Sequence, residues 1–147
     1  MTKYLLFVSV VFLSQSILAA PISKIKIESK HSLEETSKRY VSALSSAEIP
    51  VRGQKEITQK LPGGFSRNIK EIEFSNPYFG WNLGECHRGV RKDEPFKTRI
   101  WKDNRNKVWI EYSQPEVTVN KFGVIECGNE TDLVQKALDS FADAAAE

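Results

Sequence analysis

The sequence lacks any apolar run long enough to cross a membrane. A transmembrane helix needs roughly 20 consecutive apolar residues, and the longest apolar stretch, from Leu5 to Leu13, is much shorter. No cysteine directly follows that stretch, which argues against a lipoprotein signal. We therefore expect no membrane anchor in the protein.

An excess of one charge sign is also missing. The chain carries 21 basic and 19 acidic residues, and the two kinds are interleaved, as where Lys38 and Arg39 follow Glu34 and Glu35. Domains that bind nucleic acid usually present a basic stripe. The sequence therefore predicts no nucleic-acid partner.

Motifs for catalysis are scarce as well. There are only two cysteines, and the chain has no C-x-x-C, no H-x-x-x-H and no G-x-S-x-G pattern. Glu71 and Glu73 could form a carboxylate pair, but alternating acids on a half-exposed strand are typical of a solvated face. These absences favour a protein that is not an enzyme.

What the sequence does contain begins with an export signal. Lys3 supplies a positive start, Leu5–Leu13 supplies an apolar core, and a polar break precedes the small residue Ala19. We expect residues 1–19 to be removed and residues 20–147 to form one exported domain, either periplasmic or secreted.

The residue pattern predicts the order strand, helix, four strands, helix. Ser32 and Glu35 form a capping box for a helix that starts at Leu33 and ends before Pro50. Period-2 patterns predict strands at Ile25–Ile27, Ile49–Leu61, Ile72–Phe74, Phe96–Lys102 and Val108–Tyr112, and a second helix is expected over Leu133–Ala145. Antiparallel strands with segregated helices indicate an α+β fold, with a single antiparallel sheet and two helices packed on one face.

Two of these elements carry specific expectations about burial. The odd positions of the second strand share one face, with Gly53 as a bulge; they are Ile49, Val51, Ile57 and Leu61. The last helix, capped by Asn129 or Thr131, has an expected buried stripe of Leu133, Val134, Ala137, Leu138, Phe141 and Ala145.

The two cysteines have three interpretations. In an oxidising compartment, Cys86 and Cys127 are expected to form a structural disulfide. Alternatively, Cys86, His87 and Cys127 could bind zinc or copper(I), which suit thiolate and imidazole ligands. Thiol catalysis by Cys86 with His87 as base is the third, although adjacent residues of an extended chain point to opposite sides.

Aromatic residues gather in two places, the long irregular segment 76–95 and the hairpin that follows it. Trp101 and Ile100 face opposite ways, so part of the hairpin's aromatic surface is expected on the sheet face away from the helices. An exposed apolar surface there would be covered by a second copy or by a small apolar ligand. The candidate ligand-binding residues are Trp81, His87, Arg88, Trp101, Trp109 and Tyr112.

Two stretches of the chain carry a resemblance to a known family. The run from Arg99 to Pro115, with Ile100-Trp101-Lys102-Asp103 and Val108-Trp109-Ile110-Glu111-Tyr112, is similar to the conserved hairpin of domain-of-unknown-function family 302. Phe74-Ser75-Asn76-Pro77 looks like that family's Phe-Gly-Asn-Pro strand end. The resemblance covers about Ile25 to Ala145. It implies a TATA-binding-protein-like β-α-β4-α fold, often seen as dimers, and no established activity or catalytic residue.

The chain departs from that family's pattern after Asn76-Pro77. The family usually has a short apolar turn of helix there, whereas this chain has Trp81–Gly89. The sequence therefore favours an exported small binding module that engages a ligand or an envelope protein through segment 76–95 and the hairpin aromatics. The alternative is a metal-binding or thiol redox protein.

Overall fold

In the part of the chain that the structure describes, five strands and two helices follow one another in the order that the sequence predicts. In this computed structural model, the described residues are 24–75, 95–115 and 128–147. The elements are β1 (Lys24–Ser29), α1 (Leu33–Ser46), β2 (Val51–Lys60), β3 (Ser66–Phe74), β4 (Phe96–Lys102), β5 (Val108–Ser113) and α4 (Gly128–Ala146).

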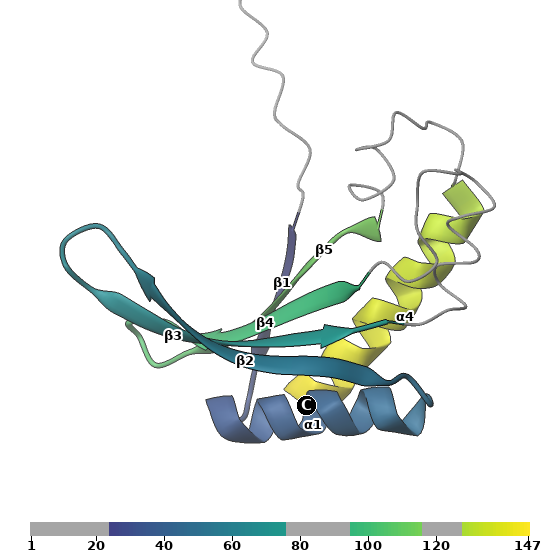
Figure 1. The fold of residues 1–147 in the computed structure, drawn as a ribbon, viewed down its shortest axis with the longest axis horizontal. Helices are drawn as coiled ribbons and strands as arrows, with labels where there is room; N and C mark the ends of the chain where they lie inside the picture. The colour runs from purple at the N-terminus through teal and green to yellow at the C-terminus, as the bar shows by residue number, and fades with distance from the viewer. Residues whose placement is uncertain (1–23, 76–94, 116–127) are drawn as a thin grey trace, which may run out of the picture.

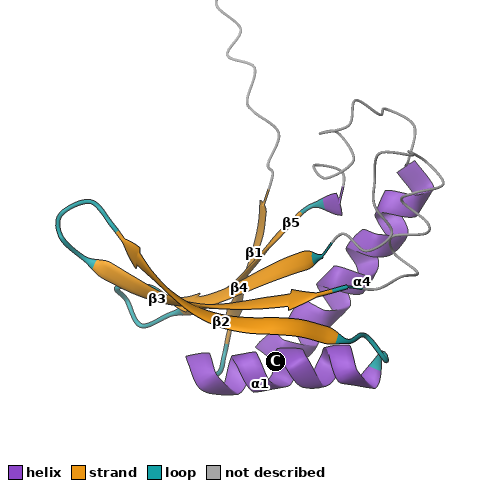
Figure 2. Cartoon of the chain, viewed as in Figure 1, coloured by secondary structure: helices purple, strands orange, loops and turns teal. Residues whose placement is uncertain are grey.

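The five strands form one sheet in the order β1-β5-β4-β3-β2. Every neighbouring pair is antiparallel. Helices α1 and α4 lie on the same side of the sheet (Figures 1 and 2). The predicted α+β fold, with a single antiparallel sheet and two helices on one face, is therefore confirmed.

Helix α1 starts where its capping residue predicts. The Ser32 hydroxyl accepts a hydrogen bond from the Glu35 amide at 3.2 Å, which satisfies one of the free amides of the first turn. Tyr40 and Leu44 of this helix are fully buried. The helix ends at the exposed C-cap residue Ala47, before Pro50 as predicted.

The core lies between the sheet and the two helices. Ile72, Ile100 and Ile110, from three adjacent strands, are fully buried there together with Tyr40 and Leu138. Polar groups within this layer are paired, as where the Tyr40 and Thr98 hydroxyls hydrogen-bond at 2.7 Å. A buried hydroxyl without such a partner would cost about 1–3 kcal/mol.

A bulge in β2 overturns the prediction that its odd positions share one face. The register shifts between Val51 and Gly53, so that Val51 pairs with Phe74 on the helix side while Ile57 pairs with Ile69 on the other side. A bulge adds one residue to one strand, and every later side chain then changes face. The bulge at Gly53 is itself confirmed.

The β2–β3 hairpin extends past the rest of the sheet. Pairing between β3 and β4 ends at Ile69 with Trp101, so the hairpin beyond that point pairs only with itself. Figure 1 shows this end of the hairpin bending away from α1. The outer end of the hairpin therefore curves toward the side of the sheet opposite the helices.

Helix α4 begins earlier than its sequence pattern suggested. It starts at Gly128, which places Asn129 and Thr131 inside the helix rather than at its cap. Val134 and Leu138 are buried as expected, but Leu133 is largely exposed because the sheet lies on the other side of the helix. Within the described ranges, neither helix combines the length and apolarity needed to cross a bilayer.

Candidate functional site

The sheet face opposite the two helices is the most distinctive surface of the described structure. Alternate side chains of each strand point to it, and no described helix packs on it (Figure 1). We call it the helix-free face. It consists of Lys24, Lys26, Glu28, Gly53, Lys55, Ile57, Gln59, Arg67, Ile69, Glu71, Glu73, Lys97, Arg99, Trp101, Trp109, Glu111 and Ser113.

One row of charges with alternating sign crosses all five strands of this face. The strand register places Lys26 opposite Glu111, Glu111 opposite Arg99, Arg99 opposite Glu71, and Glu71 opposite Lys55. We call these five residues the charge row. Opposite charges on directly paired residues stabilise a sheet by roughly 0.2–1 kcal/mol a pair.

Each of the two glutamates in the charge row is held by two cations. Arg99 Nε donates to Glu71 Oε2 at 2.8 Å, and Lys97 Nζ lies 3.9 Å from the other oxygen. The Glu111 carboxylate lies 2.9 Å from Lys24 Nζ and 3.6 Å from Lys26 Nζ. Both carboxylates therefore have full local charge compensation.

Exposure separates Glu71 and Glu111 from the cations that surround them. The side chains of Glu71 and Glu111 are only 6% and 12% exposed, whereas those of Lys24, Lys97 and Arg99 are 49%, 49% and 44% exposed. The glutamates lie beneath the ends of the basic side chains. Apart from Glu28, which is 46% exposed and paired with Lys107, the face therefore presents mainly positive charge to solvent.

The burial of Glu71 corrects the expectation of a solvated acidic pair. Glu73 is partly exposed and Lys55 Nζ lies 3.7 Å from it, but Glu71 is almost fully covered. A buried carboxylate carries a desolvation cost that has to be offset by close ion pairs and hydrogen bonds. Arg99 supplies the closest of these, from the neighbouring strand.

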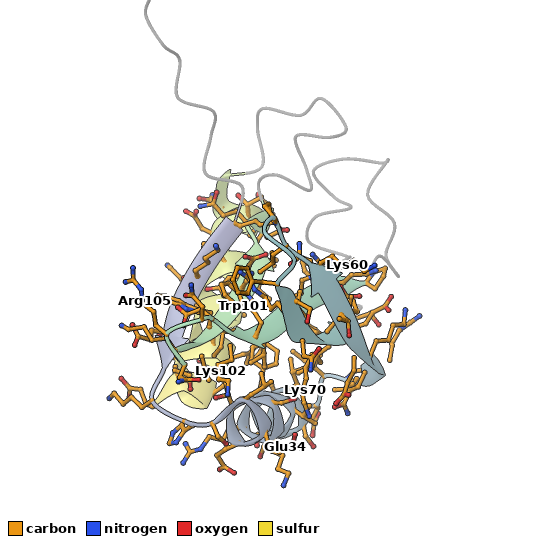
Figure 3. All side chains as sticks on the ribbon, turned by 90° about the vertical axis from the view of Figure 1, so that its left-hand side faces the viewer. Glu34, Lys60, Lys70, Trp101, Lys102 and Arg105 are labelled. Carbon is orange, nitrogen blue, oxygen red and sulfur yellow. The ribbon has the colours of Figure 1, made fainter. Side chains whose placement is uncertain are left out.

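Beside the charge row lies an apolar row that contains two tryptophans. The register aligns Ile57, Ile69, Trp101 and Trp109 across four strands, and the two indole rings are 6.4 Å apart. Figure 3 shows Trp101 on the side of the sheet away from α1, whereas Lys70 points toward Glu34 of α1.

Trp101 is covered by cations rather than left open. The Arg67 guanidinium lies 3.6 Å from the centroid of its ring, and Lys26 Nζ lies 5.4 Å from it. Such cation–π contacts contribute about 0.5–2 kcal/mol each. Among the described residues, Arg67 has no acidic partner within ion-pair distance, so its charge is available to an approaching anion.

Asp103 fixes the end of the hairpin next to these aromatics. Its carboxylate accepts a hydrogen bond from Trp109 Nε1 at 3.0 Å and others from the Arg105 and Lys107 amides. The Trp109 bond is the main cause that lowers the pKa of Asp103 below its usual value. Asp103 therefore orients the Trp109 ring while remaining ionised.

The residues that the sequence singled out do not all meet on this face. Trp101 and Trp109 are there, but Tyr112 points to the opposite side, where it is buried and donates its hydroxyl to Asp139 of α4. The remaining candidates lie outside the described residues: Trp81, Cys86, His87, Arg88 and Cys127. Within the described part of the chain, no three His, Cys, Asp or Glu residues gather as a metal site would require.

Sequence reasoning missed the cations of the helix-free face. Lys24 and Lys26 alternate on one strand, and Lys97 and Arg99 alternate on another, each two residues apart. This spacing puts both members of each pair on one face of a strand. Reading these pairs together with Glu71 and Glu73 would have suggested the ion pairs, but the strand order was needed to join them.

Comparison with known proteins agrees with the fold. The model of the family described as "Domain of unknown function DUF302" matches residues 25–145. An uncharacterized conserved protein DUF302 from Bacillus stearothermophilus has a similar crystal structure, with a TM-score of 0.71 and 19% identity, over 84% of this chain and 98% of that one. No curated protein matches the chain. The chain therefore belongs to domain-of-unknown-function family 302.

Proposed function

We propose that this protein is a small binding module rather than an enzyme, and that it receives an anionic ligand on the helix-free face. The observation that carries the proposal is the separation of charge by exposure. Glu71 and Glu111 are covered, whereas the ends of Lys24, Lys97 and Arg99 are accessible. An approaching ligand meets cations first, and complementary charge speeds and orients such encounters.

The chemistry of the face favours an anion over an apolar ligand. Trp101, which an apolar ligand would be expected to contact, is only 7% exposed because Arg67 and Lys26 lie over it. The charge row would also have to be dehydrated beneath any apolar partner, at a substantial cost in free energy. A homodimer through this face would bury the same charges, so we place the dimer second.

The proposal keeps two features of the sequence-based hypothesis. We propose that the protein acts outside the cytoplasm, which rests on the export signal predicted for residues 1–19. Segment 76–95 joins β3 to β4 and is a candidate for ligand contacts, but it is almost entirely outside the described residues. A metal or thiol redox role for Cys86, His87 and Cys127 stays an alternative that no described contact favours.

A thermal-shift screen with matched probes tests the proposal. We expect dicarboxylates and phosphates to raise the melting temperature of the purified protein in a saturable way, whereas diamines of the same length do not. A ligand at a hundredfold excess over its Kd stabilises the folded state by about 2.7 kcal/mol. All samples need the same ionic strength, since surface charge interactions are screened by salt.

Two variants locate the effect on the molecule. Arg67→Ala with Lys97→Ala removes one cation from each end of the helix-free face, and Lys38→Ala with Arg39→Ala removes two from α1, where Arg39 pairs with Glu35. We expect only the first to reduce the anion-dependent shift. Stabilisation by diamines as strong as by anions, or an equal loss in the two variants, would refute the proposal.

A further inference from the structure

A hollow of about 200 Å³ opens at one end of the helix-free face, where β1, β4 and β5 lie side by side. Three cations from two of these strands line it, Lys24 from β1 and Lys97 and Arg99 from β4. The other lining residues belong to β5: Glu111, Tyr112 and Ser113. Since a water molecule occupies about 30 Å³ in the liquid, the hollow has room for a small polyatomic group.

The charge within this hollow is positive. Glu111 is the single carboxylate among the described residues that line the hollow. It is already paired with Lys24 and with Lys26, which approaches from farther along β1. Lys97 and Arg99 share the covered carboxylate of Glu71. Three half-exposed cations therefore surround one hollow, and the one carboxylate that the described structure places there is compensated.

The donors around the hollow match the geometry of an oxyanion. Each lysine ammonium has three N–H donors and the arginine guanidinium has five in a planar fork. Arg99 uses Nε toward Glu71. Charge-assisted bonds from such groups to carboxylate or phosphate oxygens are about twice as strong as neutral ones.

We infer that this hollow is a binding site for a single carboxylate or phosphate group, held by Lys24, Lys97 and Arg99. The inference rests on the proposed function and names the part of the ligand that enters this end of the face. Carboxylate and phosphate share the recognition chemistry, so the experiment uses a separate arm for each.

Amide chemical shifts report on the site directly. We expect titration of the ¹⁵N-labelled protein with inorganic phosphate, and separately with acetate, to give saturable shifts at Lys24, Lys97, Arg99 and Ser113. Sodium chloride at matched ionic strength is the reference. The anion that saturates at the lower concentration identifies the preferred group.

A pair of double variants separates a built site from diffuse charge. Lys24→Ala with Lys97→Ala leaves Lys26 on Glu111 and Arg99 on Glu71, so the fold should persist, which the unchanged spectrum of the remote α1 residues would verify. We expect this variant to bind the preferred anion at least about tenfold more weakly, from the loss of two charged donors. The control, Lys55→Ala with Lys60→Ala, removes the same charge from β2 and should bind as the unaltered protein does.

The outcomes distinguish this inference from the proposed function. Shifts centred on Arg67 and Trp101, with affinity unaffected by Lys24→Ala and Lys97→Ala, would overturn the hollow but support anion binding by the face. An equal loss of affinity in both double variants would also overturn the hollow, since it would indicate diffuse attraction. If no anion gives saturable shifts anywhere on the face, both proposals are wrong.

Discussion

Tyr40 and Tyr112 place their hydroxyls in the buried layer between sheet and helices. Burial is the main cause that raises the pKa of Tyr40 far above its usual value. The pKa of Tyr112 is raised too, first by burial and then by its hydrogen bond to Asp139. Both phenols therefore stay protonated in the folded protein at pH values where they ionise in the unfolded chain.

This difference predicts that stability falls as pH rises above about 10. Below that value both states hold the phenolic protons and the contribution is fully present. Above it the unfolded chain releases them and the folded chain does not, so unfolding becomes more favourable, by at most about 1.4 kcal/mol per pH unit for Tyr40. Urea unfolding between pH 8 and 12 measures the slope. A double variant with Tyr40→Phe and Tyr112→Phe should have a shallower slope, and an unchanged slope would contradict the assignment.

The two cations beside Glu71 should contribute unequally to stability. Arg99→Ala removes the 2.8 Å hydrogen bond and leaves a covered carboxylate with Lys97 at 3.9 Å, which we expect to cost about 2 kcal/mol. Lys97→Ala removes only the longer contact of a half-exposed side chain and should cost less than about 1 kcal/mol. Denaturant unfolding provides the comparison.

A second substitution at the same site serves as the control. If the cost of Arg99→Ala comes from the unpaired carboxylate, adding Glu71→Gln should recover part of it, because a neutral amide is less costly to bury. Equal costs for the two alanine variants, or no recovery with Glu71→Gln, would show that Glu71 does not depend on Arg99.

At the scale of single residues, the sequence predicted the position of a side chain correctly where its cause lay within the same strand. The alternation of Ile100 with Trp101 correctly put the tryptophan on the face away from the helices. Glu71 could not be predicted as buried, because its environment is made by Lys97 and Arg99 of another strand, and Arg99 follows it by 28 residues. The order of the strands in the sheet brings Lys97 and Arg99 next to Glu71.

At the scale of elements, the sequence signals for helices, strands and bulges differed in how much of the structure they predicted. Ser32 predicted the start of α1 because a cap acts on the amides directly after it. The pattern of β2 identified the strand and its bulge at Gly53. It did not identify the change of face, because that follows from the pairing with β3 on each side of the bulge. Helix α4 begins before its apolar stripe, where polar residues gave no periodic signal.

The β2–β3 turn gives a prediction that separates the effect of backbone conformation on stability from the effect of packing. Gly64 has a φ of 81°, and a methyl group added at its Cα would meet nothing within 4 Å; Gly53 has the same free space without a positive φ. Gly64→Ala should therefore cost about 1–2 kcal/mol from the left-handed backbone alone. Gly53→Ala should be neutral or stabilising by about 0.5 kcal/mol.

Thermal unfolding of the two alanine variants measures this difference without any change in packing. The result would contradict the assigned turn geometry if Gly53→Ala were as costly as Gly64→Ala. Gly64 lies at the outer end of the hairpin, and Gly53 lies on β2, two strands away from β4. Neither substitution should therefore alter anion binding at the hollow.

At the scale of the whole molecule, export and the disulfide form one prediction. We expect the exported protein to begin at Ala20 and to have a mass lower by two hydrogens than the reduced form, because Cys86 and Cys127 are bonded. Such a bond would close a loop of about 40 residues and stabilise the protein by roughly 4 kcal/mol. Intact mass spectrometry and urea unfolding with and without reductant test both parts. Two free thiols, or a midpoint unaffected by reductant, would favour the metal or thiol alternative.

The charge row also affects whether two molecules can associate through the edges of their sheets. Both outer strands end the row with a lysine, Lys26 on β1 and Lys55 on β2. If the edge of one molecule extended the sheet of another in this register, lysine would stand opposite lysine. Like charges in directly paired positions destabilise a sheet, and lysines on edge strands are a known protection against such growth. The row that gathers cations for a ligand thus also discourages edge-to-edge aggregation.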